Sequence, residues 1–183
     1  MAGSTPLPPD APAPGGTPAT PAAPPPRHET LTTLAAQVAA IDELIGYARA
    51  SIRVFDVDLG QAGWNSPART DALASFLRAR NDAKLDIIVH ETRWIEASGA
   101  RIVALLRRYS HGVTIRRTGA EARAAMDPLL IVDGRHYLHR FHIDHPRAAL
   151  GVEEPLGAKP LITRFEEIWA TGEPGLTATV LGL

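Results

Sequence analysis

The chain has 183 residues, a net charge of −1 and no cysteine. The lack of cysteine excludes disulfides, thiolate metal sites and cysteine nucleophiles, and the near-neutral charge argues against a general binder of polyanions such as nucleic acid. Residues 1–28 are rich in proline and alanine, which predicts a disordered tail without a secretory signal. We therefore expect one cytoplasmic domain over residues 29–183. No segment has the ~18 apolar residues that a membrane span needs.

Helices and strands alternate along this domain. Helices are predicted where apolar residues recur every three or four positions, and strands where short apolar or alternating runs lie between turn residues. The predicted helices cover residues 33–50, 65–82, 92–109 and 159–172, and the predicted strands cover residues 51–59, 85–89, 113–117, 128–133 and 136–143. Ser66 and Pro67 are typical of a helix start, and Gly99 is expected to interrupt the third helix. This order predicts an α/β domain with a mostly parallel sheet flanked by helices, in which the last strand pair can be antiparallel.

Residues 124–145 read AAMDPLLIVDGRHYLHRFHIDH, an apolar run that ends at Asp133 and is followed by four histidines at a spacing of three. This stretch and the order of elements resemble the phospholipase D-like superfamily over residues 32–172. The signature of that family is His-x-Lys, four residues, Asp, six residues, and Gly-Ser-x-x-Asn. The resemblance implies a phosphodiesterase fold. In that family the His attacks phosphorus, the Lys, Ser and Asn hold the phosphoryl oxygens, and the Asp orients the His.

The signature is degenerate in this chain. Setting Asp133 on the family Asp places Met126 at the His position, Pro128 at the Lys position, Arg140 and Phe141 at Gly-Ser, and Asp144 at the Asn position. Met has no nucleophilic nitrogen, and Pro has no charge to offset the charge of a phosphorane. The resemblance therefore implies a catalytically inactive domain. It also implies a homodimer, because family members with a single motif pair to complete a site, although loss of the motif removes the catalytic reason for pairing.

The histidine-rich strand is a candidate anion site. His136, Arg140 and His142 are expected on one face of the strand, because side chains alternate between faces. Together with Asp133 they would form a cradle for a phosphate or a carboxylate. In the alternative, Arg140 forms a buried ion pair with Asp133 or Asp144. His139 is expected on the opposite, apolar face, and an arginine between two histidines repels a cation, so we predict no metal site.

His90 and Glu91 form a second candidate site. They follow the strand over residues 85–89, where open α/β sheets place their ligands, although such a dipeptide also occurs where a chain simply enters a helix. The tryptophans are predicted to be packing residues. We predict no cofactor and no catalytic residue among these candidates.

Three functions remain in competition at this point. The leading one is a non-catalytic domain that binds a small anionic ligand or a protein partner. The second is a hydrolase in which His90, His136 or His139 is the nucleophile or base. The third is a structural or assembly module whose proline-rich tail recruits a partner. Nucleic-acid binding is permitted by an excess of arginine in residues 100–150, but the overall charge argues against it.

Overall fold

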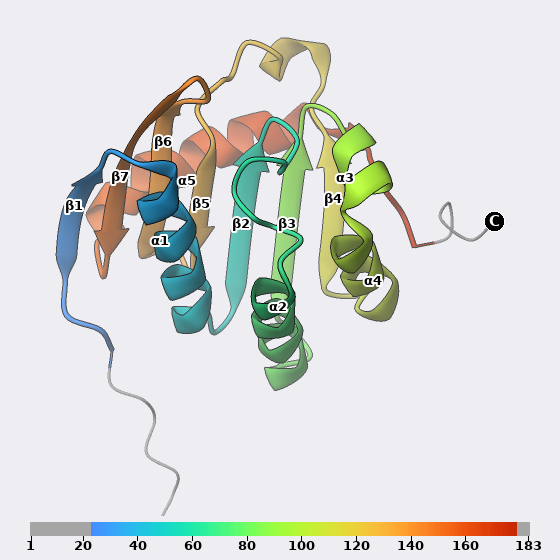
Figure 1. Ribbon diagram of the computed structural model, residues 1–183, viewed down its shortest axis with the longest axis horizontal. Coiled ribbons are helices and arrows are strands. Elements are labelled where there is room, and N and C mark those ends of the chain that lie inside the picture. Colours follow the sequence, from blue (N-terminus) through green and yellow to red (C-terminus); the bar gives the residue numbers. More distant parts are fainter. Residues whose placement is uncertain (1–22, 179–183) are drawn as a thin grey trace, which may run out of the picture.

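An eight-stranded sheet is the centre of the fold (Figure 1). The computed structural model describes residues 23–178, so most of the predicted tail lies outside the described residues. The strands follow the spatial order β1-β7-β6-β5-β2-β3-β4-β8. Their bounds are β1 (Arg27–Leu31), β2 (Ser51–Asp56), β3 (Lys84–Val89), β4 (Val113–Arg117), β5 (Leu129–Val132), β6 (His136–His142), β7 (His145–Val152) and β8 (Glu173–Pro174).

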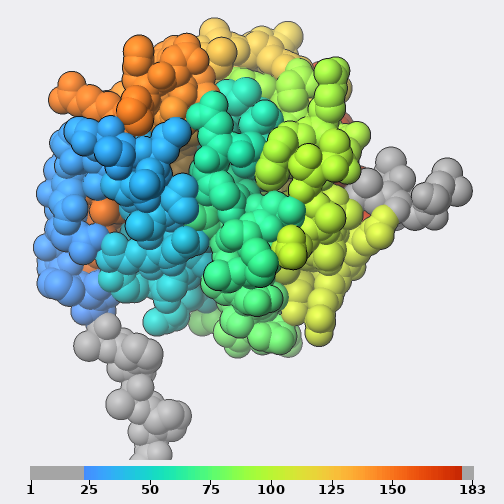
Figure 2. All heavy atoms as spheres, in the orientation of Figure 1, coloured from blue at the N-terminus to red at the C-terminus, as the bar shows by residue number. Residues whose placement is uncertain are grey.

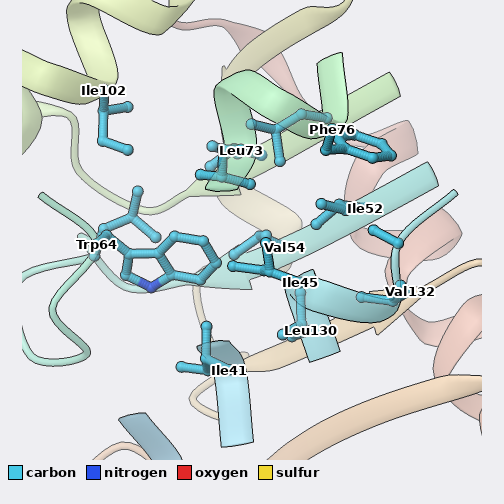
Figure 3. Close-up of a cluster of buried hydrophobic side chains, with 14 of the residues drawn as sticks. Ile41, Ile45, Ile52, Val54, Trp64, Leu73, Phe76, Ile102, Leu130 and Val132 are labelled. Carbon is cyan, nitrogen blue, oxygen red and sulfur yellow. The ribbon is translucent and has the colours of Figure 1, made fainter. Parts of the chain in front are cut away.

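Helices cover both faces of this sheet, as Figure 1 shows. The helices are α1 (Leu34–Tyr47), α2 (Pro67–Ala79), α3 (Arg93–Ser98), α4 (Ala100–Arg108) and α5 (Pro155–Ala170), and a short 3-10 turn covers Ala120–Ala122. The first four helices pack on one face, where Trp64 lies among Ile41, Val54, Leu73 and Ile102 (Figure 3). On the other face, α5 packs on the central strands through Phe165 and Ile168. The prediction of one α/β domain with flanking helices is confirmed.

The prediction that the sheet is mostly parallel is wrong. Among the described strands, only β2 with β3 and β3 with β4 are parallel, and the other five pairings are antiparallel. The reason lies in the connections. Long helical crossovers join β2, β3 and β4, whereas short turns join β5 to β6 and β6 to β7, and a short turn joins only antiparallel neighbours.

Local signals in the sequence located most helix ends. Ser66 is the N-cap of α2, and its side chain accepts a hydrogen bond from the Arg69 backbone N–H at 3.3 Å. Gly99 separates α3 from α4, where a Cβ atom would lie 2.7 Å from the Ile95 carbonyl oxygen. Both predictions are confirmed. The last helix begins at Pro155, four residues before the predicted start at 159.

Three strands were missed in the sequence: β1, β7 and the two-residue β8. β1 consists of polar residues at the edge of the sheet and begins at Arg27, inside the segment predicted to be a tail. β7 has small residues instead of alternating large apolar ones. The small residues are needed for packing, because a Cβ atom at Gly151 would lie 2.3 Å from the Tyr137 ring. Within residues 23–178, the helices are too short or too polar to cross a membrane.

Candidate functional site

The candidate residues lie at two opposite edges of the sheet. One group lies where β2, β3 and β4 have their carboxyl ends. We call this end of the strands the carboxyl edge, and it carries His90, Glu91, Arg140, His142 and Asp144. Asp133 and His136 lie at the other edge, which we call the amino edge, because Asp133 contacts the residues that begin β2. The two groups are separated by most of the length of β6. Four residues of strand span about 13 Å, so His136 and Arg140 do not form one cradle.

Asp133 is bonded to backbone at the amino edge. Its Oδ2 accepts a hydrogen bond from the Arg49 N–H at 2.7 Å, and its Oδ1 accepts hydrogen bonds from the N–H groups of Ala50 and Ser51, both at 2.8 Å. Its own N–H donates to the Ser51 carbonyl at 2.9 Å. Its φ of 51° is in the left-handed region, which aspartate tolerates better than most residues. Asp133 therefore joins the start of β2 to the turn after β5.

His136 is also bonded internally. Its side chain is almost fully buried, its Nδ1 accepts from the Glu153 N–H at 3.0 Å, and its Nε2 lies 3.4 Å from Glu153 Oε1. Burial lowers the pKa of His136, although the carboxylate of Glu153 opposes that change. This histidine stabilises the junction of β6 with the end of β7.

Arg140 is the central residue of the carboxyl edge. It is only 7% exposed, and its guanidinium donates to the carbonyl oxygens of Ile143 and His145 and to Gln61 Oε1. The Nε to His145 O and Nη1 to Gln61 Oε1 distances are both 2.9 Å. Burial lowers the pKa of Arg140, and the charges of Asp56 and Asp144 oppose the effect. Arg140 thus bonds to the turn after β6 and to the loop after β2, in place of the expected ion pair with Asp133 or Asp144.

A small cavity lies directly beneath Arg140. Five side chains with polar groups line it together with aliphatic residues of α1 and the central strands: Gln37, Asp56, Gln61, Trp64 and Arg140. Its volume of about 30 Å³ is room for about two water molecules. In the space-filling view, the turn after β6 lies above α1 and beside the loop after β2 (Figure 2). The cavity therefore lies between three segments that are far apart in the sequence.

Two groups in this cavity are costly to bury. The Asp56 side chain is almost fully buried, and burial raises its pKa to about 6 even though its Oδ1 accepts a hydrogen bond from the Val57 N–H at 2.6 Å. Trp64 is 1% exposed, and its Nε1–H has no hydrogen-bond partner among the described residues. Buried polar groups of this kind are usually paired, and perturbed carboxylates cluster at functional sites. The cavity is consequently the best-supported candidate site in the described part of the chain.

The other carboxyl-edge candidates have partners within the protein. His90 is buried, with Nδ1 2.7 Å from Thr118 Oγ1 and Nε2 2.6 Å from the Ala125 carbonyl oxygen. Glu91 forms a 2.7 Å ion pair with Arg123, and the hydrogen bond from Arg123 lowers the pKa of Glu91. His142 Nδ1 accepts from the Asp144 N–H at 3.2 Å on the exposed turn after β6. None of these residues lines the cavity beneath Arg140.

His139 lies on the α5 face of β6, as its alternation predicted. Its Nε2 is 3.5 Å from Asp127 Oδ2, and Arg164 Nη2 on α5 lies 3.0 Å from Asp127 Oδ1. Burial alone would raise the pKa of Asp127. The hydrogen bonds and charges of His139 and Arg164 together outweigh burial and lower this pKa to about 2. This cluster links β6, the segment before β5 and α5.

Sequence reasoning missed four of the five residues with polar groups in the cavity as site residues: Gln37, Asp56, Gln61 and Trp64. The sequence did contain one signal for Asp56. It ends a strand whose other inward-facing residues are apolar, and a carboxylate at such a position is costly to bury, which indicates a functional role. Gln37 and Gln61 have no such signal, since glutamines on a helix and in a loop are ordinary surface residues. Trp64 was expected to be a packing residue, and it does pack in the core.

Comparisons with known proteins agree with this architecture. Residues 33–178 match the model of a family described as "Domain of unknown function (DUF7931)". The chain belongs to this family. A search of curated protein sequences gave no match for this DUF7931 chain.

Similar solved structures place the DUF7931 fold in a wider group. Nuc from Salmonella typhimurium, a phospholipase D family member, has a TM-score of 0.59 at 17% identity over 84% of this chain and 100% of Nuc. NucT from Helicobacter pylori has a TM-score of 0.54 at 13% identity over 82% of this chain and 100% of NucT. The fold is phospholipase D-like.

TrmBL2, an archaeal chromatin protein described with a novel mode of DNA binding, has a TM-score of 0.62 at 12% identity. The match covers 81% of this chain and 54% of TrmBL2, so the chain spans about half the length of that protein. At this identity the likeness concerns the fold alone.

Replacing Asp133 tests its structural role. Asp133→Ala removes the acceptors for three backbone N–H groups and should lower the free energy of unfolding by about 2 kcal/mol, measured by urea denaturation. Asp133→Asn should cost less, because its amide oxygen still accepts hydrogen bonds and asparagine tolerates a positive φ. Equal stability of Asp133→Ala and the wild type would contradict this role.

The Asp56 carboxyl group should make stability depend on pH. Its pKa is higher in the folded than in the unfolded state, so the folded state binds more protons between about pH 4 and pH 6 and stability falls as pH rises through that window. Asp56→Asn should reduce this fall and raise stability at pH 7 by up to about 3 kcal/mol. Urea denaturation at pH 4 and pH 7 measures the difference, with Asp144→Asn as an exposed control. An unchanged fall in Asp56→Asn would refute the assignment.

Proposed function

We propose that this DUF7931 domain is a non-catalytic phospholipase D-like module that binds a small ligand at the carboxyl edge of its sheet. The observation that carries this proposal is Arg140. At the position where the family signature has a glycine, this chain has a buried arginine whose three nitrogens are all bonded to the protein. The Arg140 side chain fills space that a glycine would leave open, and a small cavity with polar and apolar walls remains beneath it.

The chemistry of the signature positions supports a non-catalytic role. Met126 and Pro128 supply neither a nucleophile nor a cation for a phosphoryl group. Asp133, which matches the signature, is at the opposite edge of the sheet, where its two carboxylate oxygens accept backbone hydrogen bonds. A group with that location acts on the fold and not on a ligand at the carboxyl edge.

The histidines of the alternative hydrolase are poorly placed for catalysis. Both ring nitrogens of His90 are bonded inside the core, and His136 lies at the amino edge. His139 has a carboxylate neighbour, as a general base often does, but its Nε2 is buried against Asp127 and α5. A nucleophile must reach its substrate, so we favour binding over hydrolysis.

Retention of two ionisable groups beneath the surface supports the binding role. Replacement of a buried charge by an apolar residue often stabilises a protein, so the burial of Asp56 and Arg140 around one cavity is difficult to explain by stability. Their opposite charges make the cavity polar without a strong net field. This arrangement favours a ligand with its own donors and acceptors over a strongly charged anion.

Partners and localisation remain predictions. The exposed apolar side chains Met126 and Phe141 are the kind of surface that a second copy or a protein partner would cover. A DNA-binding protein has a similar fold, but the net charge of −1 does not favour nucleic acid here. Location in the cytoplasm likewise rests on the sequence.

An assay of phosphodiester hydrolysis tests the non-catalytic role. Purified protein should show no turnover of bis(p-nitrophenyl) phosphate between pH 5 and pH 9, with either Mg²⁺ or EDTA, because nucleophile and phosphate clamp are missing together. An active phospholipase D-like nuclease, assayed in parallel, controls for the substrate. Turnover that is abolished by His139→Gln or His90→Gln would establish the hydrolase instead.

A further inference from the structure

The inner cavity and an outer groove share two lining side chains, Gln61 and Arg140. The groove is lined by the segment before α1, the turn after β6, and the side chains of Gln61 and Arg140. Gln61 and Arg140 also line the inner cavity, and Gln61 Oε1 accepts from Arg140 Nη1 at 2.9 Å. Movement of the Gln61 side chain would therefore join the two spaces.

Gln61 is suited to such movement. It is exposed, and the hydrogen bond to Arg140 is the contact that holds its carboxamide. Its loop, between β2 and α2, contains Leu59 and Gly63, both at a φ of 70°. By contrast, Asp56 at the end of β2 and Trp64 in the core are buried and fixed. The cavity thus has rigid walls and an exposed side chain at its mouth.

The walls present complementary hydrogen-bonding groups. The Trp64 Nε1–H is a donor with no partner among the described residues. The Asp56 carboxylate is an acceptor, and the Arg140 guanidinium is a donor. At the mouth, the protein already places a carboxamide, that of Gln61, with its oxygen on Arg140.

We propose that the cavity binds the carboxamide end of a small neutral ligand, whose oxygen replaces that of Gln61 on Arg140 and whose NH₂ group donates to Asp56. The Trp64 Nε1–H is the second donor for the ligand oxygen. The remainder of the ligand extends into the outer groove. This site deepens the proposed binding role by naming the chemical class of the ligand.

The charges of the cavity select against other classes. A carboxylate ligand would be attracted by Arg140 but repelled by Asp56, and an ammonium ligand would be attracted by Asp56 but repelled by Arg140, so in a small cavity a repulsion opposes each attraction. A carboxamide carries no charge and supplies both an acceptor and a donor. An apolar molecule would leave the Trp64 Nε1–H without a partner, which is costly in a buried site.

The experiment removes the Gln61 carboxamide and asks whether an added amide replaces it. Propionamide should raise the melting temperature of Gln61→Ala saturably, with a half-saturating concentration about tenfold lower than for the wild type, because the competing hydrogen bond is gone. Asn65→Ala is the matched control: it removes an amide side chain from the same loop, but one that bonds to Ser98 and Arg101. Its response should equal that of the wild type.

Two further comparisons make the result specific. Gln61→Glu places a carboxylate beside Arg140 and should weaken the response to propionamide, whereas Gln61→Ala with Asp56→Leu, which removes both acceptor oxygens, should lose most of it. Propionate and propylammonium chloride, at equal ionic strength, should have no saturable effect on Gln61→Ala. The proposal is overturned if Gln61→Ala and Asn65→Ala respond alike, if Gln61→Ala does not respond, or if the charged compounds act as well as the amide. These outcomes are independent of the hydrolysis assay, so failure here leaves the non-catalytic role standing.

Discussion

The guanidinium of Arg140 holds the carboxyl edge of this domain together. Its hydrogen bonds to two carbonyl oxygens hold the turn after β6, and its bond to Gln61 connects that turn to the loop after β2. These two segments lie on the outer side of the cavity, and Asp56 and core side chains line its inner side. Glycine at this position would leave both segments without these bonds, so Arg140 shapes this end of the sheet.

The carboxyl and amino edges of the sheet have different roles. At the amino edge, Asp133 and His136 bond to backbone and to the end of β7, and they stabilise the fold. At the carboxyl edge, burial of the Asp56 carboxylate costs stability, because it raises the pKa of that group to about 6. Asp133, the residue that matches the family signature, therefore has a structural role, and its presence alone does not indicate activity.

The sequence allowed the α/β class, the flanking helices and the phospholipase D-like fold to be predicted, because apolar periodicity and the run before Asp133 are strong local signals. It did not allow the mostly antiparallel pairing, since β7 has small residues that pack against Tyr137 and β1 is a polar edge strand. For the site, burial of Arg140 was expected only in the alternative that pairs it with Asp133 or Asp144; Arg140 is buried, but it bonds to Gln61 and to carbonyl oxygens instead. The hydrogen-bond partners of Arg140 were not predictable, because no sequence pattern marks Gln61 or the carbonyl oxygens of the turn. The distance between Asp133 and Arg140 was not predictable either, because it depends on where β6 begins and ends.

The central claim is that the carboxyl edge is a pocket for a neutral polar ligand and not a remnant of a phosphodiesterase site. The indole N–H resonance of Trp64 in the wild-type protein, assigned with Trp64→Phe and followed by ¹H–¹⁵N NMR, tests it most directly. Titration with propionamide should move this resonance to a plateau, while the indole resonances of Trp94 and Trp169 stay in place. No movement, or an equal and linear drift of all three resonances, would contradict the account.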